Sequence, residues 1–320
     1  MSMKIKGKDK KVAKFANWDL RRGTGRARQR AAVRDYSSTP QLLDFSTSAR
    51  NNPGMSMKTK SNDKKSRPLA LITGASAGIG AAYARRLAGQ GYDLLLVARR
   101  AERLEELAAE LANGHGVRAE ALPADLTNDA ELRVVEERIE REEHLDFLLN
   151  NAGFGVRGRF YEASLEAQDS MHRLHILATL RLSYAALRKM TARGSGAVVN
   201  VSSVAAFIAR PGSVSYHGTK AWMNEFTEGV YLELKQARSA VRVQALCPGY
   251  TVTEFHQVLG SRPARLPAGM WTPVEKVVDA SIEGLKHNKL FVVPGWRYRF
   301  LVLLLRLLPR FLLHAGSSWG

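Results

Sequence analysis

The 320-residue sequence contains a single cysteine, Cys247. One cysteine cannot form an internal disulfide, and this composition fits a reducing compartment. No stretch approaches about 18 consecutive apolar residues, so no membrane-spanning helix is expected. The first residues lack the apolar core of a secretion signal. These absences favour a cytoplasmic protein, in which we expect Cys247 to be a buried packing residue.

Acidic residues are scarce at the N-terminal end. Residues 1–66 contain 17 Lys or Arg and 5 Asp or Glu, and therefore carry +12 of the total net charge of +18. The globular part is only mildly basic. The segment has little apolar periodicity and is not expected to fold by itself. A nucleic-acid arm has little support, because the few aromatic residues in the segment offer little base stacking.

The same segment contains a repeat: residues 1–11 return in similar form as residues 55–65. One alternative is that Met55 or Met57 is the working start. A second is a transit peptide, since residues 20–30 are rich in arginine and poor in acids. The third is a solvated basic tail.

A glycine-rich turn follows an apolar run at residues 69–80 and leads directly into a helical pattern. Strand, turn and helix in this order form the site that a nucleotide pyrophosphate needs. Gly74 allows the tight exit from the strand. Gly78 and Gly80 allow backbone N–H groups to approach phosphates and the helix to pack close to the sheet.

From Arg67 onward, apolar strands alternate with amphipathic helices. Strands are expected at residues 69–73, 93–98, 118–122, 144–150, 196–201, 241–246 and 290–293, and helices at 81–87, 101–112, 128–142, 165–189, 216–235 and 274–286. This alternation predicts an α/β fold with one doubly wound parallel sheet covered by helices on both faces. We expect a single catalytic domain at residues 67–294, followed by an apolar and basic helix within residues 295–320.

Three polar residues indicate chemistry: Ser203 follows the fifth strand, and Tyr216 and Lys220 open the next helix. Tyr216 and Lys220 are four apart, so their side chains share one face of a helix. An adjacent ammonium favours the tyrosinate form, which lets Tyr216 exchange a proton with a hydroxyl or a carbonyl. Ser203 is the natural donor to hold the substrate oxygen.

The end of the second strand indicates the cofactor. Enzymes of this architecture that use NAD place an acid there for the ribose 2′-hydroxyl, whereas a basic residue suits a 2′-phosphate. Here the strand is followed by Arg99 and Arg100. We therefore predict NADP (NADPH), with Arg99 as the main contact.

The glycine turn at Thr73–Gly80 is followed in order by Asp125–Leu126, Asn150–Gly153, Ser203, Tyr216 with Lys220, and Pro248–Thr253. In these motifs the chain resembles the short-chain dehydrogenase/reductase family from about Arg67 to Leu290. The resemblance implies a Rossmann-type fold and makes Tyr216 the acid/base, Ser203 the group that positions the carbonyl, and Lys220 the group that holds the nicotinamide ribose and lowers the tyrosine pKa. It also implies a cofactor site that includes Tyr216, Lys220 and the following residues: Gly74, Ser76, Gly78, Ile79, Gly80, Arg99, Arg100, Asp125, Leu126, Asn151, Ala152, Gly153, Pro248, Gly249, Val252 and Thr253. No metal site is assigned.

One position departs from the pattern of the family. Where relatives usually carry an asparagine that shapes a water site beside the catalytic lysine, this sequence has His175. Two interpretations stay open: a proton relay through the imidazole, and a histidine satisfied by local hydrogen bonds.

The C-terminal segment at residues 296–313 is both apolar and cationic. As a helix it places Arg299, Arg306 and Arg310 on one stripe, and Pro309 is expected to kink it. Trp296 and Tyr298 at one end suit a membrane interface with anionic lipid. The alternative is a helix that packs on the core or on a second subunit, which also leaves a homo-oligomer open.

These features predict an NADP-dependent oxidoreductase that transfers hydride between nicotinamide and a carbonyl or secondary alcohol. The small-molecule substrate is expected to be lipophilic if the C-terminal helix touches a membrane. A rival of another class is a dinucleotide-binding regulatory protein that has lost turnover. The intact residues Ser203, Tyr216 and Lys220 argue against that rival.

Overall fold

A computed structural model describes residues 67–254 and 267–309. The expectations for residues 1–66, for the repeat and for residues 310–313 lie outside the described residues. None of the described helices is long and apolar enough to cross a bilayer.

The described chain is built on one parallel sheet of seven strands in the order β3-β2-β1-β4-β5-β6-β7. The strands are β1 (Leu69–Thr73), β2 (Asp93–Ala98), β3 (Ala119–Pro123), β4 (Leu145–Asn150), β5 (Ala197–Val201), β6 (Arg242–Leu246) and β7 (Phe291–Val292). The chain moves outward from β1 in one direction and then restarts at β4 in the other. This reversal separates the loops after β1 and β4 and creates the crevice in which such sheets bind ligands.

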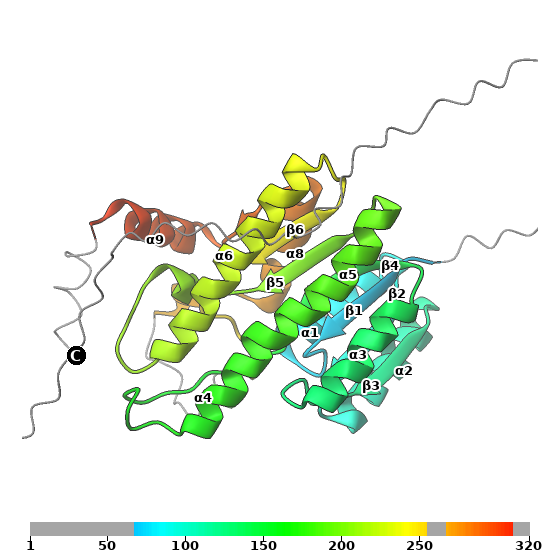
Figure 1. Cartoon of the computed structure of the whole chain (residues 1–320), viewed down its shortest axis with the longest axis horizontal. Helices are drawn as coiled ribbons and strands as arrows, with labels where there is room; N and C mark the ends of the chain where they lie inside the picture. Colours follow the sequence, from blue (N-terminus) through cyan, green and yellow to red (C-terminus); the bar gives the residue numbers. More distant parts are fainter. Residues whose placement is uncertain (1–66, 255–266, 310–320) are drawn as a thin grey trace, which may run out of the picture. The chain divides into compact units, whose positions relative to one another are not determined.

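Helices cover both faces of the sheet (Figure 1), as the sequence predicts. Their bounds are α1 (Gly78–Ala88), α2 (Ala101–His115), α3 (Asp129–Arg141), α4 (Leu165–His172), α5 (Thr179–Arg193), α6 (Val214–Gln236), α8 (Val274–Lys286) and α9 (Trp296–Leu307), with short helices η1 (Arg173–Ala178), η2 (Val204–Phe207) and η3 (Ala268–Met270). One buried cluster joins the sheet to α1, α2 and α8, and a second joins it to α3, α5 and α6. The two clusters explain why the strands are apolar on both sides.

Local sequence signals fix three of the helix ends. The Asn128 side chain accepts hydrogen bonds from the backbone of Ala130 (2.9 Å) and Glu131 (3.2 Å), which starts α3. Helices α2 and α5 end at Gly116 and Gly194, which have φ of 64° and 78°.

The expected helix at residues 165–189 differs from the structure. It is divided by a π-helical turn, Arg173–Ala178, between α4 and α5. Such turns widen the helix locally and are frequent at functional sites. Apolar periodicity does not reveal it, because a widened turn keeps the same buried face.

Candidate active site

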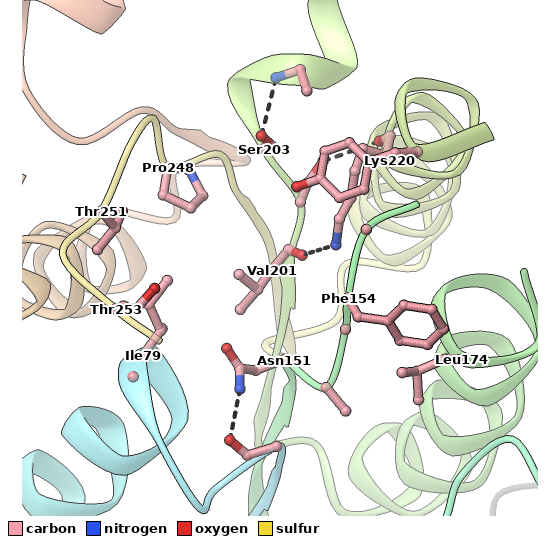
Figure 2. A pocket seen from close by; sticks show the side chains of 18 of the residues that line it. Ile79, Asn151, Phe154, Leu174, Val201, Ser203, Lys220, Pro248, Thr251 and Thr253 are labelled. Atoms are coloured by element: carbon pink, nitrogen blue, oxygen red, sulfur yellow. Dashed lines mark hydrogen bonds between the residues drawn. The ribbon is translucent and has the colours of Figure 1, made fainter. Parts of the chain in front are cut away.

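A cavity of about 750 Å³ opens where the strands end. Its walls come from the loops that follow β1 to β6, together with α6 and α9. Figure 2 shows these walls converging, with Asn151, Ser203, Lys220 and Thr253 around one space.

The glycine turn has little room for side chains. Gly74 and Gly78 have φ of +65° and +56°, in the left-handed region. At Gly80, a Cβ would lie 2.3 Å from the Gly74 carbonyl oxygen, and at Gly78 it would lie 3.1 Å from Thr253. The turn therefore allows a close approach of backbone to a ligand, and α1 begins directly beside it.

Asn151 ties the loop after β4 to the glycine turn. Its side-chain amide donates to the carbonyl oxygens of Thr73 (2.9 Å) and Gly74 (3.2 Å). The Thr73 hydroxyl in turn accepts from the backbone N–H groups of Asn151 (2.9 Å) and Ala152 (3.0 Å). The two loops on either side of the crevice are thus held together at its base (Figure 2).

Two arginines stand at the end of β2. Arg99 lies 4.0 Å from the carboxylate of Asp125, and its side chain is largely exposed. Arg100 donates to the Ser76 hydroxyl (3.0 Å) and to Glu254 (3.2 Å), which also accepts from Arg103 at 2.9 Å. These hydrogen bonds hold the pKa of Glu254 below its usual value. Arg100 therefore faces the glycine turn at Ser76. The Glu254 carboxylate competes with an anionic ligand for its guanidinium.

The predicted catalytic residues come from β5 and α6. Ser203 follows β5, and its Oγ accepts from the Ala205 backbone at 3.1 Å. Lys220 is buried and donates from Nζ to the Val201 carbonyl at 2.7 Å. Its Nζ lies 5.9 Å from the centre of the Tyr216 ring. Ser203, Tyr216 and Lys220 all line the cavity.

Burial controls the protonation of this group. It raises the pKa of Tyr216 to about 12, although a hydrogen bond with Ser203 acts in the opposite direction. It also lowers the pKa of Lys220 to about 7. Burial of both side chains opposes the tyrosinate form that Lys220 is expected to favour. At neutral pH the phenol keeps its proton.

His175 lies beneath the cavity, on the π-helical turn. The imidazole is fully buried, with Nδ1 2.9 Å from the hydroxyl of Thr219. Because the Thr219 hydroxyl donates to the Tyr216 carbonyl (3.0 Å), its oxygen accepts from His175 Nδ1–H. Nε2 is then an acceptor, without a hydrogen-bond partner among the described residues. Burial, Lys220 and His172 hold the pKa of His175 well below its usual value, so the ring is neutral.

Most residues assigned to the cofactor site line the same cavity. They are Gly74, Ser76, Gly78, Ile79, Arg99, Arg100, Asp125, Leu126, Asn151, Ala152, Gly153, Pro248, Gly249 and Thr253. Gly80 is buried behind the turn and acts through its missing side chain. Val252 does not line the cavity and is 61% exposed.

Two residues that the sequence analysis did not assign to the site also support it. His217 lines the cavity, and its Nδ1 donates to the Ala205 carbonyl at 3.0 Å, which ties α6 to the loop after Ser203. The Tyr298 hydroxyl accepts from the Tyr250 backbone (3.0 Å) and donates to the Met270 carbonyl (2.6 Å). Both contacts join segments distant in sequence, so no local spacing reveals them.

Residues 68–263 match the sequence pattern of the family described as short chain dehydrogenase. The chain belongs to this family. Gluconate 5-dehydrogenase of Gluconobacter oxydans is 33% identical to this short-chain dehydrogenase over 221 residues, 67% of this chain and 85% of the relative. Because the chain belongs to this family and is similar to such a dehydrogenase, it is an NAD(P)-dependent oxidoreductase.

Two solved structures are similar to this short-chain dehydrogenase. A short-chain dehydrogenase from Sphingobium yanoikuyae in complex with NADPH has a TM-score of 0.69 and 39% identity, covering 74% of this chain and 92% of its own. A bulky-bulky ketone specific alcohol dehydrogenase from Comamonas testosteroni has a TM-score of 0.65 and 33% identity, covering 76% and 95%.

Proposed function

We propose that this enzyme is an NADP-dependent carbonyl reductase in which Tyr216 donates the proton. The observation that carries the proposal is that Ser203, Tyr216 and Lys220 line one cavity, where desolvation raises the pKa of the Tyr216 phenol. A protonated phenol suits a group that must give a proton to an oxygen developing negative charge. The same geometry serves the reverse reaction when the phenol is deprotonated.

Each catalytic side chain has a distinct task in this proposal. The Ser203 hydroxyl, held by the Ala205 backbone, orients the substrate oxygen toward Tyr216. Lys220 places its Nζ 5.9 Å from the centre of the Tyr216 ring and is available to a ribose hydroxyl from the cavity wall. The bound nicotinamide supplies the hydride, which is the redox chemistry that the protein lacks.

His175 is a positioning residue in the same proposal. Its Nδ1–H donates to Thr219, which in turn holds the Tyr216 carbonyl at the start of α6. Local hydrogen bonding satisfies one side of the ring, whereas the buried Nε2 faces Gly153, where a Cβ would lie 2.7 Å away. The arrangement fixes the imidazole as a neutral ring that donates to α6 through Nδ1 and presents Nε2 to the loop at Gly153.

Preference for NADP is supported by the residues at the end of β2. Arg99 and Arg100 line the adenosine side of the cavity, where a 2′-phosphate needs cationic donors. The similar dehydrogenase of Sphingobium yanoikuyae was solved with NADPH. The carboxylate of Asp125 lies 4.0 Å from the Arg99 guanidinium, which is largely exposed.

The substrate end of the cavity favours a bulky apolar carbonyl compound. Its walls include the apolar residues Phe154, Val156, Ile208, Met270, Leu301 and Leu305, with Arg157 and Arg210 as cationic groups among them. Apolar walls with a few converging polar groups bind apolar ligands in one orientation. The specificity named for the Comamonas testosteroni relative, bulky ketones, agrees with such a pocket.

A substrate panel tests the proposal. NADPH oxidation is followed with bulky aryl ketones, steroid ketones, acyl thioesters and short ketones side by side, with Tyr216→Phe as the control. Turnover of bulky apolar ketones by the wild type alone is the expected result. NADPH binding without turnover of any carbonyl compound would instead identify a dinucleotide-binding regulatory protein.

Association of two copies is a further proposal. Leu180 and Tyr184 expose apolar surface on α5, at 42% and 63%. Sedimentation equilibrium measures the molar mass in solution. A monomer at micromolar concentration would contradict the proposed association.

A further inference from the structure

Helix α9 is attached to the fold by one face. Tyr298, Val302 and Leu305 point to the same side, at spacings of four and three residues, and the first two are buried. The hydroxyl of Tyr298 fastens this face to Met270 and Tyr250. Tyr298 is therefore an anchor to the core and not the interfacial residue that the sequence suggested.

The opposite face of α9 is apolar and exposed. Trp296, Phe300, Leu303 and Leu307 are 68%, 57%, 52% and 71% exposed. At about 100° per residue, these four side chains fall within an arc of about 60°. We call them the outer stripe. A helix on the surface of a soluble protein normally presents polar residues on its outer side. The outer stripe therefore marks an interaction surface.

Arginines flank the outer stripe on both sides. Arg297 lies on one side, and Arg299 and Arg306 lie on the other. None of the three forms an ion pair with a carboxylate among residues 67–254 and 267–309. Arg306 instead lies over the rings of Phe207 and Phe291, at 4.9 and 5.0 Å. Residues 286–320 contain six Lys or Arg and no Asp or Glu.

The helix also forms part of the pocket wall. Leu305 and Leu301 line the cavity, and Leu301 is 38% exposed. Leu304 lies between Leu301 and the outer stripe on the helix surface and is 38% exposed as well. Apolar side chains therefore continue from the cavity around the helix to the outer stripe.

We propose that the outer stripe docks on an anionic lipid surface and that a lipophilic carbonyl substrate reaches the cavity from the bilayer along α9. A helix lying in the interface buries its apolar face at the boundary of the acyl chains and places flanking arginines at the phosphates, a role open to Arg297 and Arg299, whereas Arg306 packs on Phe207 and Phe291. A second copy of the chain suits the stripe less well, because pairing two such helices sets arginines against arginines. The substrate part of the inference rests on the proposed reductase function.

Vesicle binding by the full chain tests the docking. Co-sedimentation compares the wild type, Leu303→Asp and Val134→Asp with vesicles of phosphatidylcholine alone and of phosphatidylcholine with phosphatidylserine. Val134 is a matched control, since it is 53% exposed but lies on α3. We expect Leu303→Asp to lower partitioning onto the anionic vesicles by about tenfold or more. Val134→Asp should leave it unchanged.

The basic residues 1–66 are present in every variant, so only the difference between variants reports on α9. Equal pelleting of the wild type and Leu303→Asp would overturn the proposal and assign any binding to another part of the chain. A loss of oligomers in Leu303→Asp without any vesicle binding by the wild type would also overturn it, in favour of a second copy. Quenching of Trp296 by brominated lipid, lost in Trp296→Phe, is the expected independent signal.

Activity measurements separate this inference from the proposed function. With a water-soluble ketone, Leu303→Asp should retain wild-type kcat/KM, because the outer stripe faces away from the cavity. With a lipophilic ketone supplied in anionic vesicles, its kcat/KM should fall about tenfold. Equal rates in vesicles would overturn bilayer delivery while leaving the reductase intact. Failure of the wild type on every ketone would overturn the reductase while leaving the docking result valid.

Discussion

The imidazole of His175 lies 2.9 Å from the hydroxyl of Thr219, and this contact sets which nitrogen carries the proton. The hydroxyl hydrogen is used on the Tyr216 carbonyl, so Nδ1 donates and Nε2 accepts. The neutral imidazole thereby lies next to the catalytic cluster, with its ring centre 5.9 Å from that of Tyr216.

His175→Asn should lower kcat by about fivefold, the value of one lost hydrogen bond. The shorter amide leaves the Thr219 oxygen without the donor that holds the start of α6. Steady-state kinetics across pH measure the effect, and Thr219→Val should change kcat in the same direction. Full activity with an unchanged pH profile would reduce the histidine to a tolerated substitute.

Cofactor preference should follow Arg99. The wild type should show a higher kcat/KM with NADPH than with NADH, and Arg99→Ala should lower the NADPH value by about tenfold with little change for NADH. Arg141→Ala is the control, because Arg141 pairs with Glu137 on an exposed surface. A wild-type kcat/KM that favours NADH would refute the assignment.

The Glu254 carboxylate should weaken the binding of NADPH. Its carboxylate accepts from both Arg100 and Arg103, and a 2′-phosphate has to compete for the same donors. Glu254→Gln should therefore tighten NADPH binding by about threefold, measured by fluorescence titration. NADH serves as the reference ligand. Weaker NADPH binding in Glu254→Gln would mean that the carboxylate holds the arginines in place instead.

Lys220 should limit stability below about pH 10. Its pKa falls from the usual 10.5 to about 7 on folding, so the unfolded chain binds more protons between these values. The contribution of Lys220 to stability therefore decreases as pH falls from about 10 to 7 and stays level below 7. The Tm advantage of Lys220→Met over the wild type should therefore grow as pH falls from about 10 to 7. The variant should lose turnover. A Tm difference independent of pH would contradict the lowered pKa.

The sequence was sufficient for the sheet and for the position of the site. Apolar runs bounded by helical patterns predict the strands to within one or two residues, and residues after strand ends meet at one edge of any parallel sheet. Gly74, Asn151 and Ser203 therefore come together without knowledge of tertiary contacts.

Other features depend on contacts that no local pattern encodes. The protonation of Tyr216 and Lys220 depends on how deeply α6 is buried, whereas the sequence shows only that the two side chains share a face. The pairing of Arg103 with Glu254 spans 151 positions. The two faces of α9 could not be assigned because Tyr298 becomes an anchor only where it meets Met270 and Tyr250.

The variant Tyr216→Phe tests directly whether Tyr216 donates the proton to the substrate. The change removes the transferable proton and leaves the ring, so NADPH affinity should stay within about threefold of the wild type while kcat for a bulky ketone falls at least about 100-fold. Single-turnover reduction and NADPH titration on the same preparation give both values. A variant that retained more than about a tenth of the wild-type kcat would contradict Tyr216 as the proton donor.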